Sequence, residues 1–163
     1  MRIILATLWL LVPLGFAAYH YGPGQEQVKL DHTEVFLAQA RSAVQDKHWN
    51  SAIESYQKAL AKLPKENKET SMRIQLEIAK AKMQNSGLPE AREDLAKLVS
   101  QLNEDTTISS ELKEETLSTL ANARYYMTYL MKLEGLPAEE WEPEIEAARQ
   151  EYKLLAQTGS DKE

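Results

Sequence analysis

The chain has few residues whose type and spacing could support catalysis or metal binding. Its three histidines, His20, His32 and His48, lack the spacing that ligands of a single metal ion need. Cysteine is absent, which excludes a zinc–thiolate site and a thiol nucleophile. The sequence also has neither a Gly-x-Ser-x-Gly nucleophile elbow nor a glycine-rich phosphate loop. We therefore expect no enzyme activity, no metal site and no cofactor.

An acidic stretch near the C-terminus is the remaining candidate for chemistry. It contains the glutamates Glu139, Glu140, Glu142, Glu144 and Glu146. Such a density of carboxylates could bind Ca²⁺ or serve a helical hydrolase or lyase, but the Asp/Asn-Gly loop of calcium sites is missing. Acidic side chains are also favoured at the start of a helix, where they interact with the helix dipole. We interpret the stretch as a solvent-exposed helix start.

An eight-residue phrase that occurs three times indicates how the chain is organised. Its copies are residues 37–44 (LAQARSAV), 76–83 (LEIAKAKM) and 120–127 (LANARYYM), and each fits L-x-x-A-[R/K]-x-x-[V/M]. The copies begin about 40 residues apart, which is a repeat period typical of stacked helical hairpins. The phrase therefore predicts a scaffold built from repeated helix pairs.

Apolar residues at helical spacing, interrupted by turn residues, predict three antiparallel helical hairpins. No run of alternating β-branched residues predicts a strand, so we expect an all-α fold. The hairpins form one domain over residues 32–157. The expected helices cover about residues 32–46, 51–63, 67–86, 89–102, 111–134 and 142–157.

The first hairpin carries a pattern of large, small and aromatic residues that closes on a proline. In order, these residues are Phe36, Ala40, Trp49, Ala52, Tyr56, Ala59 and Pro64. The pattern resembles the tetratricopeptide repeat family, whose repeats are helix pairs of about 34 residues. The resemblance is strong over residues 33–66 and extends over residues 33–157. It implies an α-solenoid of about three hairpins.

The later copies match the family pattern less completely. The second, residues 72–103, lacks the aromatic residues and the closing proline but keeps Ile78, Ala79, Ala91, Leu95 and Leu98. The third keeps Leu120 and Ala123, and its returning helix starts late. The array therefore consists of three repeats, or of two repeats and a cap.

The basic residue of the repeated phrase is our first candidate for contacting a partner. Arg41, Lys80 and Arg124 follow the alanine in the three copies, and the resemblance implies that this position faces a concave groove. We expect the groove to be apolar, to carry three positive charges and to bind a protein or peptide with acidic groups. Alternatively, the three residues are ordinary exposed cations on an acidic chain. The expected apolar lining is Leu37, Val44, Leu76, Met83, Leu120 and Met127.

A cluster of aromatic residues is the second candidate. Tyr125, Tyr126 and Tyr129 lie on the fifth expected helix, and Trp141 follows in the sequence. The cluster packs this helix against the last one, or part of it is exposed and docks another subunit. The second interpretation rests on the enrichment of tyrosine, tryptophan and methionine at interfaces.

Residues 1–24 differ from the rest of the chain. Residues 3–18 carry no charge and follow the basic Arg2, which is the layout of a secretory signal or of a transmembrane signal anchor. Either outcome places residues 25–163 on the outer side of a cytoplasmic membrane, anchored to it or released into the periplasm. We expect residues 25–31 to be a linker and residues 158–163 to be a disordered tail.

Composition limits the classes of partner. The net charge of −6 and the pI of about 5.2 argue against nucleic acid, whose binding needs a basic surface. Without cysteine the chain has no site for a lipoprotein anchor. We therefore expect a non-catalytic adaptor of a bacterial envelope that binds a protein or peptide. The alternative is a structural subunit of a membrane complex, or a solenoid that associates with itself; the oligomeric state is left open.

Overall fold

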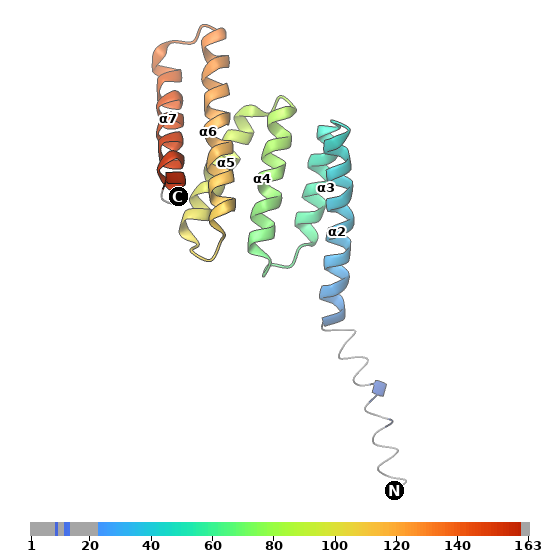
Figure 1. Ribbon diagram of the computed structural model, residues 1–163. Coiled ribbons are helices and arrows are strands. Elements are labelled where there is room, and N and C mark those ends of the chain that lie inside the picture. The colour runs from blue at the N-terminus through green and yellow to red at the C-terminus, as the bar shows by residue number, and fades with distance from the viewer. Residues whose placement is uncertain (1–8, 10–11, 14–22, 161–163) are drawn as a thin grey trace.

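The computed structural model describes residues 9, 12–13 and 23–160 of the chain (Figure 1). Within this part the regular structure is entirely helical, which confirms the predicted all-α fold. None of the described helices is both long and apolar enough to cross a membrane. The helices between residues 23 and 160 are α2 (Pro23–Gln45), α3 (Trp49–Lys62), α4 (Lys68–Gln84), α5 (Leu88–Glu104), α6 (Ser110–Leu133) and α7 (Ala138–Ser160).

The helices pair into three antiparallel hairpins that stand in a row (Figure 1). Within the hairpins α2 packs on α3, α4 on α5 and α6 on α7, and the hairpins meet where α3 contacts α4 and α5 contacts α6. Helices α2, α4 and α6 all begin on the same side of the row, which is the lower side in Figure 1. The expected hairpin pairing is therefore what the structure shows.

The largest differences from the expected boundaries lie at two prolines. Helix α2 begins at Pro23, so residues 25–31 are helical and the predicted linker is wrong. Proline is tolerated in the first turn of a helix, where its missing N–H would have no partner, so Pro23 is compatible with the helix that the described residues form. Helix α7 begins at Ala138 and contains Pro143, which was expected at the start of the helix.

The two ends of the chain are described only in part. Helix α7 extends to Ser160, so residues 158–160 of the predicted tail are helical. Residues 161–163 lie outside the described residues. The same holds for almost all of the predicted signal or anchor, residues 1–24.

The turn of the second hairpin brings the backbone at Gly87 close to the end of α4. Ser86 adopts the left-handed conformation, with φ of 61°, whereas Gly87 has φ of −97°. The amide of Gly87 donates a hydrogen bond to the carbonyl of Lys82 at 2.9 Å. A Cβ atom at position 87 would lie 3.3 Å from that carbonyl oxygen. Glycine is therefore suited to this turn because the two backbone segments approach closely.

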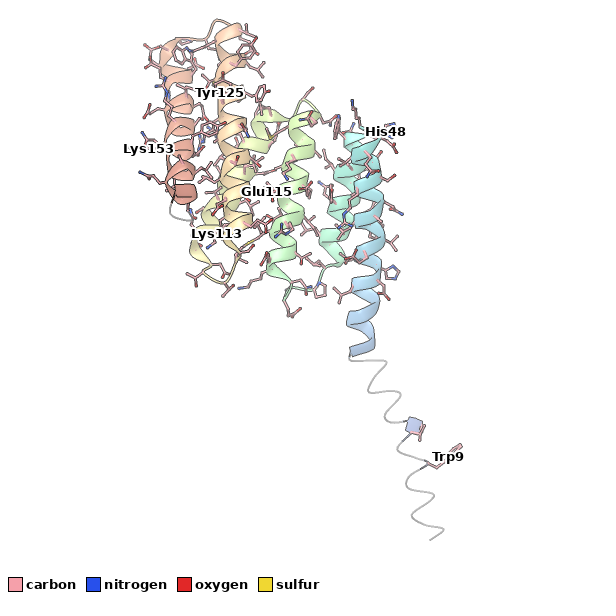
Figure 2. All side chains as sticks on the ribbon, viewed as in Figure 1. Trp9, His48, Lys113, Glu115, Tyr125 and Lys153 are labelled. Atoms are coloured by element: carbon pink, nitrogen blue, oxygen red, sulfur yellow. The ribbon has the colours of Figure 1, made fainter. Side chains whose placement is uncertain are left out.

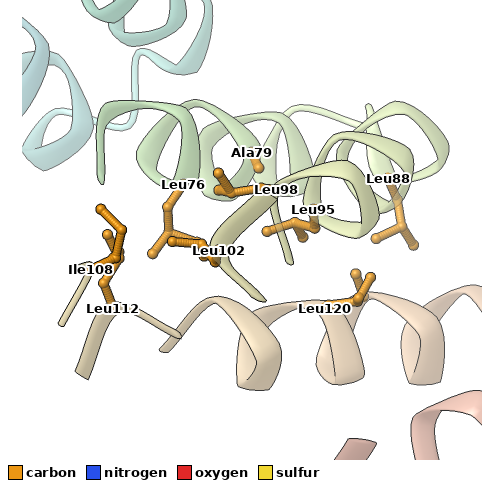
Figure 3. Packing of buried hydrophobic residues seen from close by; sticks show 10 residues of the cluster. Leu76, Ala79, Leu88, Leu95, Leu98, Leu102, Ile108, Leu112 and Leu120 are labelled. Carbon is orange, nitrogen blue, oxygen red and sulfur yellow. The ribbon is translucent and has the colours of Figure 1, made fainter. Parts of the chain in front are cut away.

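The core is divided into two clusters by α4. Ile74 and Ile78 pack into the first cluster together with Tyr56 and small residues of α2 and α3. Leu76 belongs to the second cluster, which α5 and α6 complete (Figure 3). Because α4 buries opposite faces, it joins the first hairpin to the last. The fully buried alanines that allow close helix contact in the first cluster are Ala40, Ala52 and Ala59.

The third hairpin is longer than the second. Helix α6 has 24 residues, whereas α4 and α5 have 17 each. The Ser109 hydroxyl donates to the Glu69 carboxylate at 2.7 Å, so α4 and α6 start close together. At 1.5 Å per residue, the extra length carries α6 about 10 Å past the end of α4. In Figure 1 the α6–α7 turn stands beyond the α4–α5 turn, which leaves a step between the hairpins.

Candidate functional site

A cleft of ≈ 790 Å³ lies at this step, and we refer to it as the step cleft. Side chains at the end of α4, in the α4–α5 turn and at the start of α5 form one wall. The last turns of α6 and the residue Leu136 form the other. The first wall consists of Met83, Gln84, Ser86, Leu88 and Pro89. The second consists of Tyr126, Met127, Tyr129, Leu130, Met131, Glu134 and Leu136.

The apolar side chains on α6 are exposed because the shorter second hairpin does not reach them. Tyr126 is 57% exposed, Tyr129 54% and Leu130 42%. Beneath them, Met127 and Met131 are half-buried. Contiguous exposed apolar surface marks interaction sites, and methionine adapts its shape to different occupants. The cleft therefore has the composition of a protein-binding surface.

The structure divides the predicted aromatic cluster. Tyr126 and Tyr129 line the step cleft, but Tyr125 does not, although it is 54% exposed. Figure 2 places Tyr125 towards the α6–α7 turn, and its ring meets the Tyr126 ring edge-on, with the ring centres 6.2 Å apart. The Lys132 ammonium lies 3.8 Å from the centre of the Trp141 ring, and this contact closes the end of the third hairpin. Trp141 therefore packs within the hairpin, whereas two of the three exposed tyrosines line the step cleft.

The predicted row of open positive charges is wrong. Arg41 is exposed and pairs with no carboxylate of the described residues. Lys80 pairs with Glu77 at 2.8 Å and with Glu115 of α6 at 2.6 Å, and Figure 2 labels Glu115 between the two helices. Burial alone would lower the pKa of Lys80, but the hydrogen bonds to Glu115 and Glu77 raise it. The lysine therefore joins α4 to α6 and is not free to attract an acidic ligand.

The apolar residues of the predicted groove are also placed differently. Leu37, Leu76 and Leu120 are core residues, at most 6% exposed, and Val44 packs half-buried against the first cluster. The phrase therefore marks the packed face of each first helix. Only its last position contributes to the candidate site: Met83 and Met127 line the step cleft from opposite walls.

Arg124 belongs to a network of buried ions that the sequence did not reveal. It donates to Glu144 at 2.8 Å and to Glu151 at 2.9 Å, and Arg92 of α5 donates to both oxygens of Glu144. Glu144 is 8% exposed, so its assignment to an exposed helix start is wrong. The network joins α5, α6 and α7. The sequence does contain one signal for it. Glu144, Ala148 and Glu151 are spaced so that they lie on one face of the helix, and Ala148 is buried.

Burial affects the pKa of the Glu151 carboxyl more strongly than the partner Arg124 does. Burial raises the pKa of the Glu151 carboxyl, and the Arg124 guanidinium opposes this only in part. The Oε2 atom of Glu151 is buried and accepts no hydrogen bond from the described residues. This carboxylate is therefore a weak member of the network.

The step cleft is suited to binding rather than to chemistry. Among its described lining residues, Glu134 is the only charged group, and none is a histidine. The described part of the chain holds no group of three histidine, aspartate or glutamate side chains placed to bind a metal ion. No family model matches the sequence, and no curated protein or solved structure resembles it significantly. The geometry of the step cleft is therefore the basis for a function.

Proposed function

We propose that the protein is a non-catalytic interaction scaffold that binds a protein or peptide partner in the step cleft. The observation that carries the proposal is the group of exposed apolar residues on α6, Tyr126, Tyr129 and Leu130, over a half-buried methionine floor. A monomer that exposes such a surface loses the free energy that burial would provide, at about 25 cal/mol per Å². A docked partner would recover it.

We further propose that the scaffold is a tetratricopeptide-like α-solenoid. Support comes from the row of three hairpins and from the fully buried alanines of the first one. The third hairpin, with its longer helices, serves as the terminal cap that a solenoid needs. In this scaffold the step cleft lies between the last full repeat and the cap.

The proposal includes the location inferred from residues 1–24. Whether this segment anchors the chain or is a cleaved signal, it precedes α2 in the sequence. Helix α2 begins on the lower side of the row in Figure 1, and the α6–α7 turn lies on the upper side. An anchored scaffold on the outer side of the membrane would therefore hold the step cleft on the side away from the bilayer.

Photo-crosslinking from two matched tyrosines tests the proposed site. Tyr129 and Tyr125 lie one turn apart on α6 and are equally exposed, at 54%, but only Tyr129 lines the step cleft. Each is replaced in turn with p-benzoylphenylalanine in the full chain, in cells of its own source. We expect a discrete adduct with a partner polypeptide from position 129 and a much weaker one from position 125, which contacts Tyr126 but does not line the cleft.

The same experiment can overturn the proposal. Identical adducts from both positions, or no adduct from position 129, would remove the step cleft as the docking site. Adducts that join two copies of this chain would favour the self-associating alternative instead.

A further inference from the structure

We infer that the occupant of the step cleft is an amphipathic helix whose polar face is basic. This inference rests on the proposed function and adds the chemistry of the partner. Two observations carry it, the charges around the cleft and the shape and composition of its walls.

Four carboxylates lie in or next to the segments that line the step cleft, and none of them has a cationic partner among the described residues. Glu134 lines the cleft, Glu90 follows the lining residue Pro89, and Glu139 and Glu140 begin α7 just after Leu136. All four are exposed, and none pairs with a cation of the described residues. The rim is therefore acidic.

Two lysines near this rim do not cancel its charge. Lys82 pairs with Asp94 at 2.5 Å. The Lys132 ammonium, which lies against the Trp141 ring, keeps its charge but is outnumbered by the four carboxylates. A partner with lysine or arginine next to its apolar residues would complement the rim and associate faster. An acidic partner would meet repulsion. This reverses the partner charge that the repeated phrase suggested.

The walls favour a helix as the occupant. The described part of the chain has no strand, so no sheet edge is present to which an extended peptide could add. The apolar lining on α6 runs from Tyr126 to Met131 with Leu130 between them, and methionines lie on both walls. A helix presents apolar side chains at matching spacing, one or two turns at a time. Methionine-rich grooves accommodate such faces because the side chain is unbranched and flexible.

Charge also argues against two other occupants of the cleft, a second copy of the chain and an anionic membrane. A second copy of the chain would bring its own net charge of −6 to an acidic rim. An anionic lipid surface would be repelled in the same way. A basic amphipathic helix is the occupant that satisfies both the apolar walls and the rim.

Three synthetic peptides test the inference. They share one leucine face with i, i+3, i+4, i+7 spacing and carry lysine, glutamine or glutamate at all other positions. Binding to the full chain, held in phosphatidylcholine nanodiscs, is measured by fluorescence anisotropy. We expect the lysine peptide to bind about tenfold more tightly than the glutamine peptide at low salt. The glutamate peptide should be weakest, and added salt should reduce the differences.

Matched variants assign the binding to the step cleft and its rim. Tyr129→Ser should weaken all three peptides, and it should do so more than Tyr125→Ser, because Tyr125 contacts Tyr126 but does not line the cleft. Glu134→Gln should reduce the preference for lysine over glutamine about twofold. Glu104→Gln should leave it unchanged, because Glu104 is exposed at the other end of α5.

The outcomes separate this inference from the proposed function. Equal affinity for the three peptides, still lowered by Tyr129→Ser, would overturn the basic partner and leave the docking site intact. Binding that Tyr129→Ser does not change would overturn both. Dimerisation of the chain that Tyr129→Ser abolishes, seen by sedimentation, would assign the cleft to a second copy. Tyr129-dependent binding to empty phosphatidylcholine vesicles would assign it to a membrane.

Discussion

Glu144 lies almost completely buried between two arginines from different helices. Arg92 of α5 and Arg124 of α6 both donate to it, and Glu151 holds the other side of Arg124. Burying a carboxylate is costly unless it is paired, and this one is paired twice. The packing of the third hairpin against the second therefore depends more on Glu144 than on Glu151.

Two isosteric substitutions test this difference. Glu144→Gln leaves two partly buried guanidinium groups without their shared carboxylate, and we expect it to lower the free energy of unfolding by about 3 kcal/mol at pH 7. Glu151→Gln should cost less than about 1 kcal/mol, because burial already disfavours the charged form of this residue. Urea denaturation measures both. Equal losses would contradict the unequal roles.

The pH dependence of the free energy of unfolding tests the role of Glu151 independently. Its pKa is raised above the ordinary value of 4.5, so the folded protein binds the proton more tightly than the unfolded chain. Its stabilising contribution is complete below about pH 4.5 and is lost as the pH rises through the folded pKa. The exposed Glu146 should behave oppositely, because the hydrogen bond from Gln150 lowers its pKa. The stability of the wild type relative to Glu151→Gln should therefore rise on acidification, and relative to Glu146→Gln it should fall.

At this scale the sequence predicted residue types better than residue roles. The repeated phrase marked packed positions, such as Leu76 and Ala79, because helical spacing is a local property. It misassigned Lys80 and Arg124. The Glu77–Lys80 pair has local i, i+3 spacing, but the partners on other helices, Glu115 and Glu144, lie far away in the sequence. No local pattern reveals such pairs.

Close contact between the first two helices depends on side chains that add almost no volume. Ala52 of α3 is completely buried in the first core cluster, whereas Ala61 of the same helix is exposed. A larger residue at position 52 would have to push the helices of the first hairpin apart.

Leucine substitutions at these two positions test the close contact. Ala52→Leu should reduce the free energy of unfolding by about 2 kcal/mol, because a well-packed core has no room for three more carbons. Ala61→Leu should change it by less than about 0.5 kcal/mol, since leucine at an exposed helical position is nearly as favourable as alanine. Both are measured by denaturation with urea. A tolerated leucine at position 52 would show that the hairpin is loosely packed.

Most helix boundaries were accessible from the sequence. Helices α3, α4, α5 and α6 begin and end within about two residues of the expected positions. The exceptions follow from how proline was interpreted. Residues 25–31, just after Pro23, were expected to be a linker although they are helical. Pro143 was expected in the first turn of the last helix although it lies inside α7.

The step cleft is a property of the whole molecule. It arises because the third hairpin is longer than the second and because α4 and α6 start together, as the Ser109–Glu69 hydrogen bond shows. The sequence predicted a long fifth helix, but it gave no indication of which end would project. The chain's surface tyrosines on α6 become a candidate site only through this alignment of hairpins.

Methionine methyl groups report on the cleft directly. Met83, Met127 and Met131 line it, whereas Met72 lies in the first turns of α4 and packs against the second core cluster. In the full chain labelled with ¹³C-methyl methionine, we expect the lysine peptide to shift the resonances of the three cleft methionines. The resonance of Met72 should stay where it is in the free protein. If the peptide saturates the protein and the cleft methionines do not shift, or if Met72 shifts as much as they do, the step cleft is not the docking site.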